Sequence, residues 1–166
     1  ASAGSLARTL GVMNITRASA ADAEAISALI HLLSHHFLAR PEGPETTVFF
    51  AATNAASMAK HIEDPARLYL LAKSSDTLLG FISLKDRTRI SQFFVHPEHQ
   101  RQGIGSALWQ AALSAFLASQ GACLTVDSSQ YALNVYRHFG FVPEGPVTQA
   151  GGVVYIPMRR RARDDA

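Results

Sequence analysis

Glutamine and glycine residues follow an apolar segment, residues 90–95, in a pattern that can bind an anion. Gln100, Gly103 and Gly105 have the spacing Gln-x-x-Gly-x-Gly, and a segment with helical periodicity comes next. The first amide groups of a helix have no partners within it, and the helix dipole adds partial positive charge there. Because glycine has no side chain, a phosphate can approach such a backbone closely. The sequence therefore predicts a phosphate-binding site at the start of a helix.

Two common phosphate-binding motifs do not fit this segment. A Rossmann fingerprint requires a third glycine three residues after Gly105, where Leu108 stands. A P-loop requires a lysine followed by serine or threonine, and no lysine occurs between Pro97 and Gln120. Neither a dinucleotide nor a P-loop nucleotide is therefore the expected ligand.

A second motif lies further along the chain. Ala132 is followed by Tyr136, and the pair Gly140-Phe141 closes the short helix expected there. Together the two motifs resemble those of the GCN5-related N-acetyltransferase (GNAT) superfamily, in which the Gln/Arg-x-x-Gly-x-Gly/Ala motif holds the pyrophosphate of acetyl-CoA. The resemblance extends over residues 15–158 and implies an acetyltransferase with the GNAT fold.

The resemblance implies where acetyl-CoA, the family's co-substrate, binds. In the family two parallel strands separate, and the pantetheine arm lies between them; here these are residues 90–95 and 124–127. Ser129 stands where the family often has asparagine, and Val135 where an aromatic residue is frequent. The residues that the resemblance assigns to the co-substrate are Phe94, Val95, Gln100, Arg101, Gln102, Gly103, Ile104, Gly105, Ser106, Ser129 and Asn134. No metal is expected.

Tyr136 is the expected general acid. Acetyl transfer to an amine releases a thiolate, and thiols have a pKa of about 8.5 against about 10 for tyrosine. Proton transfer from tyrosine to the departing sulfur is therefore nearly balanced, and the family's tyrosine at this position usually has that role. The alternative is a tyrosine that only packs on its short helix.

Several groups compete for the role of proton acceptor. An alkylammonium ion has to lose a proton before it attacks the thioester. Many family members carry a glutamate on the strand before the glycine turn, but residues 90–95 contain no acidic residue. Asp127, at the end of its strand, is the catalytic residue we select. His96, Glu98 and a chain of water molecules are the alternatives.

The acceptor is expected to be a primary amine of a small molecule, peptide or protein. The family's first helices and their loop line the acceptor site, so His35, His36 and Phe37 are the candidates. His31 and His35 have the i, i+4 spacing of a metal-binding pair. The sequence offers no convincing further metal ligand, so we expect His31 and His35 to be an exposed or substrate-side pair that binds no metal.

Hydrophobic periodicity places these motifs on a mixed α/β fold. Ser19 is predicted to cap the first helix, with Asp22 as its capping-box partner. The resemblance adds that the central sheet is mostly antiparallel, is splayed between two parallel strands and is flanked by helices. The predicted strands cover residues 15–18, 68–72, 78–84, 90–95, 124–126, 141–142 and 153–156, and the predicted helices cover about 20–36, 54–62, 103–119 and 131–139.

Length and charge fit a single catalytic domain. The 166 residues divide into a disordered leader or cloning remnant (1–12), a GNAT domain (13–158) and a charged tail (159–166). The net charge of +2 argues against a nucleic-acid partner, although the tail's arginines leave that alternative open. No apolar stretch approaches the roughly 20 residues of a membrane span, and one cysteine allows no internal disulfide. A cytoplasmic protein without a membrane partner is expected.

Two functions besides amine acetylation compete. The first is a catalytically degenerate acyl-CoA-binding or sensing module, which the missing acid in residues 90–95 favours. The second is a regulatory protein that uses the fold only as a scaffold. The strand 153–156 is a candidate for pairing across a homodimer, and a covered edge strand is the alternative.

Overall fold

The computed structural model describes residues 13–163, so the expected leader at residues 1–12 lies outside the described part. The strands are β1 (Met13–Arg17), β2 (Arg67–Ser74), β3 (Thr77–Lys85), β4 (Arg89–Val95), β5 (Cys123–Ser128), β6 (Val142–Pro143), β7 (Thr148–Ala150) and β8 (Val153–Arg161). The helices are α1 (Ala23–Leu33), α2 (Pro44–Ala52), α3 (Ala55–Glu63), α4 (Ile104–Ala118) and α5 (Leu133–His138), with 3₁₀ turns η2 (Ala20–Asp22), η3 (Ser34–His36) and η4 (Pro97–His99). Among the described residues, no helix combines the length and hydrophobicity needed to cross a bilayer.

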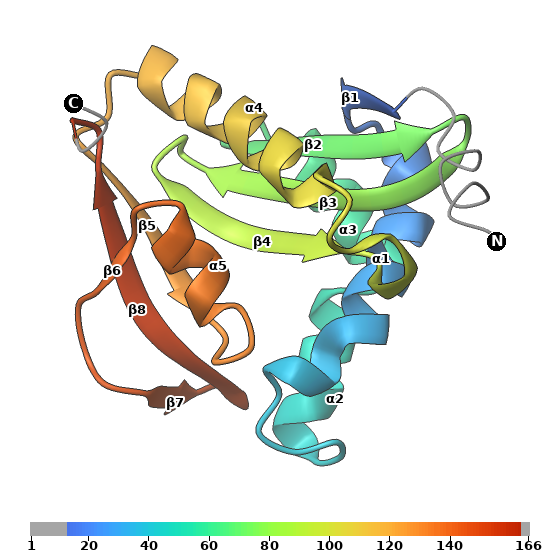
Figure 1. Ribbon diagram of the computed structural model, residues 1–166. Helices are drawn as coiled ribbons and strands as arrows, with labels where there is room; N and C mark the ends of the chain where they lie inside the picture. The colour runs from blue at the N-terminus through green and yellow to red at the C-terminus, as the bar shows by residue number, and fades with distance from the viewer. Residues whose placement is uncertain (1–12, 164–166) are drawn as a thin grey trace, which may run out of the picture.

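The strands form one mixed sheet that opens in the middle. Their order is β1-β2-β3-β4-β5-β8-β6, and β7 pairs with β8 outside this path. The pairing of β4 with β5 is parallel, and the other pairings are antiparallel. Figure 1 shows β1 to β4 as one half of the sheet, with β5 and β8 as a second half that leans away from it. The predicted mixed α/β class, mostly antiparallel and splayed at one parallel pair, is confirmed.

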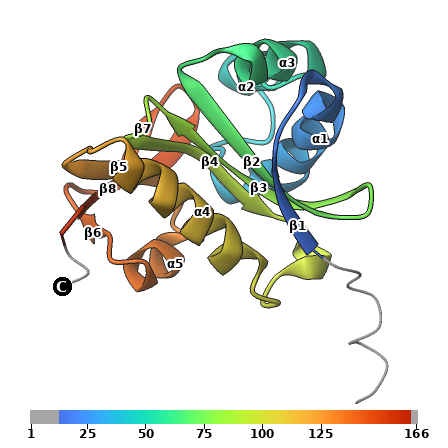
Figure 2. The same ribbon diagram turned by 90° about the horizontal axis from the view of Figure 1, so that it is seen from above.

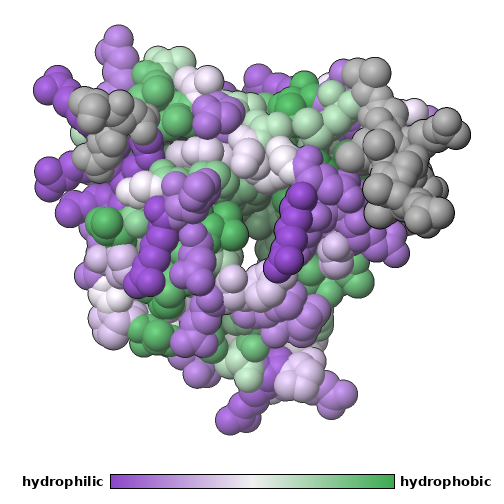
Figure 3. Space-filling model, in the orientation of Figure 1, coloured by the Kyte–Doolittle hydropathy of each residue, from purple (hydrophilic) through white to green (hydrophobic). Residues whose placement is uncertain are grey.

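Helices cover both faces of the sheet and make two cores. Figure 2 shows α1, α2 and α3 on one side and α4 with α5 on the other. Ile26 and Met58 pack on Phe81 in the first core, while Leu108 and Phe116 of α4 belong to the second. The periodicity of α1 and α4 accounts for this, because each helix presents apolar residues to the sheet. On the face drawn in Figure 3, the surface is hollowed between the two halves, and hydrophobic side chains show in the hollow.

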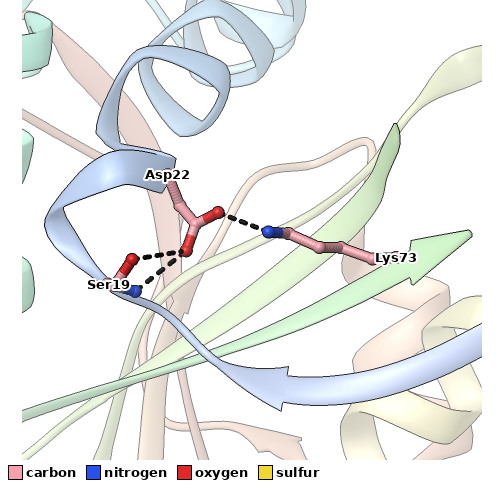
Figure 4. Close-up of polar contacts among 3 residues, drawn as sticks. All are labelled: Ser19, Asp22 and Lys73. Atoms are coloured by element: carbon pink, nitrogen blue, oxygen red, sulfur yellow. Dashed lines mark hydrogen bonds and ion pairs between the residues drawn. The ribbon is translucent and has the colours of Figure 1, made fainter. Parts of the chain in front are cut away.

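A polar cluster fixes the start of the first helix against the sheet (Figure 4). The backbone N–H of Ser19 donates to Asp22 Oδ2 at 2.8 Å, as the predicted capping box requires, and the helix begins as η2. Lys73 of β2 donates to the other carboxylate oxygen at 2.5 Å. Burial alone raises the pKa of Asp22, but the hydrogen bonds from Lys73 and Ser19 outweigh it and lower that pKa below its ordinary value.

The segment between α1 and β2 contains one helix more than the sequence pattern predicts. Pro41, Gly43 and Pro44 indicate a loop, yet α2 begins at Pro44. Proline is favoured in the first helical turn, where its missing N–H has no helical partner to lose. The predicted second helix is α3, and Asn54 caps it by accepting a hydrogen bond from the Ser57 N–H at 2.9 Å.

The prediction of a charged tail from residue 159 is wrong for the residues that the structure describes. β8 continues to Arg161 and pairs with β5 along that strand's length. Arg160 is 3% exposed, donates from Nε to the Phe139 carbonyl at 2.8 Å and lies 5.5 Å above the Trp109 ring. An arginine can be buried in this way because its stem is apolar and its guanidinium can pack on an aromatic ring. A run of arginines therefore does not by itself indicate a solvent-exposed segment.

The first part of β8 is covered within the chain. Val153 and Tyr155 pair with β7, and Ile156 pairs with β5. The structure thus shows the covered-edge alternative for residues 153–156.

Candidate active site

The site lies where β4 and β5 separate. They are paired at Arg89 with Thr125 and at Ile90 with Val126, at the beginning of β4. Beyond these pairs the described residues of the two strands make no further ladder, and β4 continues toward α4 while β5 continues toward α5. The separation opens a gap in the centre of the sheet.

A β-bulge accounts for the change in direction of β4. Leu84 of β3 is paired with Ile90, but the preceding residue, Ser83, is paired with Gln92. Ser91 is therefore an extra residue on β4. A bulge bends its strand and increases the local twist, so β4 turns away from β5 just after their parallel contact.

Two adjoining cavities, which share lining residues, occupy this gap. The larger one has a volume of about 450 Å³ and the smaller about 400 Å³. Both are bounded mainly by apolar and aromatic side chains, as small-molecule sites usually are. The residues that line both, and so mark where they meet, are Phe37, Phe93, Phe94, Ser129, Ala132 and Tyr136.

The beginning of α4 borders the smaller cavity and suits an anion. Gly103 is the N-cap in the left-handed region at φ 82°, and no side chain caps the helix. Arg101 also has a positive φ of 63°, so the backbone turns sharply just before the helix. The first amides of α4 have no helical partners. A Cβ added at Gly105 would meet Phe93 and Val95 at an ordinary 3.8 Å, so protein packing does not require this glycine.

The expected co-substrate residues fall into two groups. Six of the eleven predicted residues line the smaller cavity: Phe94, Val95, Gln100, Arg101, Gly105 and Ser129. The others are Gln102, Gly103, Ile104, Ser106 and Asn134, which are absent from its lining. Ile104 is 2% exposed and belongs to the core beneath α4. Asn134 is exposed on α5.

Tyr131 is a lining residue that sequence reasoning missed. Its hydroxyl donates to Gln100 Oε1 at 3.1 Å, and Gln100 Nε2 donates to the Val95 carbonyl at 3.1 Å. These bonds connect the β5–α5 segment with the end of β4. Tyr131 precedes Ala132 of the late motif, but nothing in its sequence context indicates a partner thirty-one positions earlier.

Tyr136 is buried where the two cavities meet. The residue is 5% exposed, and its ring makes edge contacts with Phe93 and Phe141 at centroid distances of 6.1 and 5.5 Å. Burial raises the pKa of Tyr136 above its ordinary value. The phenol is therefore protonated at neutral pH and able to donate.

Asp127 lines the larger cavity and has a partner there. Its Oδ2 lies 2.5 Å from the Arg89 guanidinium, which also lines this cavity. The pair lies at the closed end of the gap, where β4 and β5 are still paired, because Arg89 and Val126 both belong to the parallel contact. The same cavity contains Gln92 of β4, whose Oε1 accepts a hydrogen bond from the Tyr69 hydroxyl at 3.2 Å.

The three expected acceptor residues lie in different places. Phe37 lines both cavities, His36 lines the smaller one, and His35 lines neither. His35 packs on His36 with a centroid distance of 4.0 Å. The structure therefore brings His36 next to the expected co-substrate residues.

Histidines elsewhere in the described chain do not enter the cavities. His31 Nε2 is 2.9 Å from the Thr53 hydroxyl, which gives its ring a structural partner. His96, Glu98 and His99 of the η4 turn bring their ligand atoms within 4.8 Å of one another. His96 Nδ1 already accepts the Glu98 N–H at 3.2 Å.

Comparison with known proteins gives the family. The profile of the acetyltransferase (GNAT) domain matches residues 34–162. The fold agrees with this match. The mixed sheet opens at one short parallel pair, and the helix that begins at the gap has no side-chain cap. The chain belongs to the GNAT acetyltransferase family.

Solved structures share this fold at low sequence identity. The GCN5-related N-acetyltransferase from Rhodopseudomonas palustris aligns with a TM-score of 0.74 and 22% identity over 92% of this chain and 98% of its own. The PaiA N-acetyltransferase from Thermoplasma acidophilum, in complex with coenzyme A, gives 0.75 and 18% over 90% and 99%. YncA from Salmonella typhimurium, with its cofactor acetyl-CoA, gives 0.66 and 18% over 94% and 97%.

Proposed function

We propose that this protein transfers an acetyl group from acetyl-CoA to a primary amine of a small molecule, peptide or protein. The observation that carries the proposal is the position of Tyr136, which lines both cavities at their junction. A thioester donor in the smaller cavity and an amine in the larger one would meet beside this side chain. The family and the relatives solved with coenzyme A and acetyl-CoA support the same function.

The smaller cavity is the co-substrate side of the proposed site. The first amides of α4, with Arg101 beside them, would hold the diphosphate, and the backbone of Phe94 and Val95 would hold the pantetheine arm. Each charge-assisted hydrogen bond contributes about 1.5–3 kcal/mol. A Cβ built at Gly103 would meet nothing within 4 Å, which leaves room for a ligand that approaches the backbone closely. When bound, acetyl-CoA supplies the activated acetyl thioester.

The reaction forms one bond and breaks one. The lone pair of the neutral amine attacks the thioester carbonyl, and a carbon–nitrogen bond forms. The carbon–sulfur bond then breaks, and the sulfur leaves with the electron pair and takes a proton. The nitrogen gives up one proton, so the products are an N-acetyl amide and the free thiol of coenzyme A.

Tyr136 is the proposed donor of the proton to sulfur. Its raised pKa keeps it protonated until negative charge develops nearby. A phenol in an apolar site is a weaker acid than tyrosine in water, so transfer is expected only as the sulfur gains charge. This restricts protonation to the step in which the thiolate departs.

Asp127 is the proposed final acceptor of the amine proton, which would reach it through a chain of water molecules along the larger cavity. It is the one carboxylate among the described residues that line the larger cavity. Its ion pair with Arg89 occupies Oδ2, which leaves Oδ1 to accept a hydrogen bond from water.

A thiol-release screen tests the proposed function. Purified protein is incubated with acetyl-CoA and panels of alkylamines, polyamines, amino acids, aminoglycosides and peptides. We expect at least one class to release thiol well above the acceptor-free rate, with an N-acetyl product identified by mass spectrometry. Tyr136→Phe serves as the matched control for catalysis.

A non-catalytic acyl-CoA sensor is the second candidate. The observation that favours it is the lack of an acid on β4, where Gln92 instead accepts from Tyr69. A sensor would bind coenzyme A and gain thermal stability without turnover. A rise in melting temperature with coenzyme A, combined with no thiol release for any acceptor class, would establish this alternative.

A further inference from the structure

Two opposite charges meet in the larger cavity. Among the described residues that line it, Arg89 and Asp127 are the ones with a formal charge at neutral pH. The rest of the wall is apolar, aromatic or neutral and polar. Its aromatic surface comes from Phe37, Phe49, Phe93, Phe94, Tyr136 and Tyr155. The cavity is therefore neutral overall, with its charges gathered at one end.

The neutral balance disfavours acceptors that are only cationic. A polyamine or a lysine-rich peptide would bring positive charge next to Arg89 and find no acid that lacks a partner. Like charges at short range in a partly desolvated site repel each other. An acceptor with its own negative group avoids this conflict.

Arg89 has donors available for such a group. A guanidinium carries five N–H donors in a planar fork that matches a carboxylate. One terminal nitrogen contacts Asp127 at 2.5 Å, and within residues 13–163 no other side-chain hydrogen bond to this guanidinium is found. The Arg89 side chain is 45% exposed, so its remaining donors are accessible.

We propose that Arg89 binds a carboxylate of the acceptor, which makes the acceptor a small molecule with an amine at one end and a carboxylate at the other. Asp127 positions the guanidinium through their ion pair. This inference rests on the proposed acetyl transfer and names the substrate class of the same site. The bond changes of the reaction are unaltered, because the carboxylate stays ionised throughout.

The length of β4 sets the spacing between the two groups. Arg89 begins β4, whereas Phe94, at the junction of the cavities, lies near its other end. A strand rises about 3.3 Å per residue, so the five residue steps from Arg89 to Phe94 span about 16 Å. An α-amino acid is too short to cover the part of this distance that the extended arginine side chain does not reach. The acceptor therefore needs a spacer, as in an ω-amino acid or a dipeptide, and the aromatic wall can pack against that spacer.

Matched pairs of acceptors test the proposal. Thiol release from acetyl-CoA is measured for glycine, 4-aminobutyrate, 6-aminohexanoate and 8-aminooctanoate, each beside the alkylamine that lacks the carboxylate. Dipeptides and their C-terminal amides form a second arm, and spermidine and an aminoglycoside form a third. We expect kcat/KM to favour the carboxylate member of a pair by about tenfold or more at the best spacer length.

Variants connect the preference to Arg89. Arg89→Gln should abolish the carboxylate preference by raising KM for the amino acids relative to the matched alkylamines, and Arg89→Lys should restore part of it. Arg17→Gln, which removes a guanidinium from exposed β1, is the control and should keep the full preference. A melting-temperature rise with coenzyme A in each variant shows that the fold persists.

The outcomes separate this inference from the proposed function. Turnover that favours spermidine or the plain alkylamines, or a carboxylate preference that survives in Arg89→Gln, would overturn the Arg89 proposal and leave acetyl transfer standing. No thiol release with any acceptor, despite binding of coenzyme A, would overturn both.

Discussion

The imidazole of His36 stacks on the ring of Tyr131, with centroids 3.8 Å apart and planes inclined by 12°. His36 belongs to η3 after α1, and Tyr131 lies between β5 and α5, so the contact joins the two halves of the molecule beside the smaller cavity. Burial and then the neighbouring His35 lower the pKa of His36, which keeps this ring neutral at neutral pH.

Tyr131→Ala should weaken binding of coenzyme A by about two- to tenfold. The substitution removes a stacked aromatic pair, worth about 0.5–1.5 kcal/mol, and with it the pre-organised wall of the smaller cavity. Isothermal titration calorimetry measures the change. Tyr131→Phe is the matched control, because it keeps the ring and loses only the hydroxyl bond to Gln100. Equal affinities for wild type and Tyr131→Ala would show that the stack does not support the site.

Tyr136→Phe should lower kcat by about tenfold or more while the dissociation constant for coenzyme A stays unchanged. Phenylalanine preserves the edge contacts with Phe93 and Phe141, so the fold should persist. Single-turnover thiol release measures the chemical step, and calorimetry measures binding. A variant with wild-type kcat would remove Tyr136 from the role of general acid.

Gly103→Ala and Gly105→Ala should separate folding from binding. Gly103 adopts φ 82°, so a side chain there costs about 1 kcal/mol of unfolding free energy, although its Cβ would meet nothing within 4 Å. Gly105 lies inside α4, where alanine is favoured, and its Cβ has ordinary contacts. Gly105→Ala should therefore keep its stability in urea denaturation but bind coenzyme A more weakly. A stable Gly105→Ala protein with undiminished affinity would contradict the assignment of the smaller cavity.

Asp127→Asn distinguishes two roles of this carboxylate. If Asp127 receives the amine proton, kcat should fall for every acceptor. If Asp127 only positions Arg89, KM should rise for carboxylate-bearing acceptors alone. We expect both effects, with rates measured for paired amino acids and alkylamines across pH. A variant that matches wild type in both respects would leave Asp127 with neither role.

Local patterns predicted most of the fold. The meander of β2, β3 and β4 and the long helix α4 follow from apolar runs and periodicity, which depend on neighbouring residues. The sequence pattern did not predict α2, because its apolar residues do not fall on one face of the helix. The end of β8 was hidden because Arg160 is buried by contacts with Phe139 and Trp109, which come from distant parts of the chain.

The candidate site was predictable where one segment forms it. Val95, Gln100, Arg101 and Gly105 from the motif segment line the smaller cavity, and Tyr136 lines both cavities. Contacts between residues that lie far apart in the sequence were not predictable. The sequence places Arg89 and Asp127 far apart, and only the parallel contact of β4 with β5 brings them together. Tyr131 was missed for the same reason, because its partners come from other elements.

The pairing of β8 with β5 also bears on the order in which the protein assembles. β5 shares six paired positions with β8, from Cys123 with Arg161 to Ser128 with Ile156, but it meets β4 at two. On the ribosome, the β1–β4 half can therefore collapse with its helices while β5 still lacks most of its hydrogen-bond partners. The second wall of the gap takes shape after β8 has emerged, so the space between β4 and β5 is enclosed later than the β1–β4 half folds.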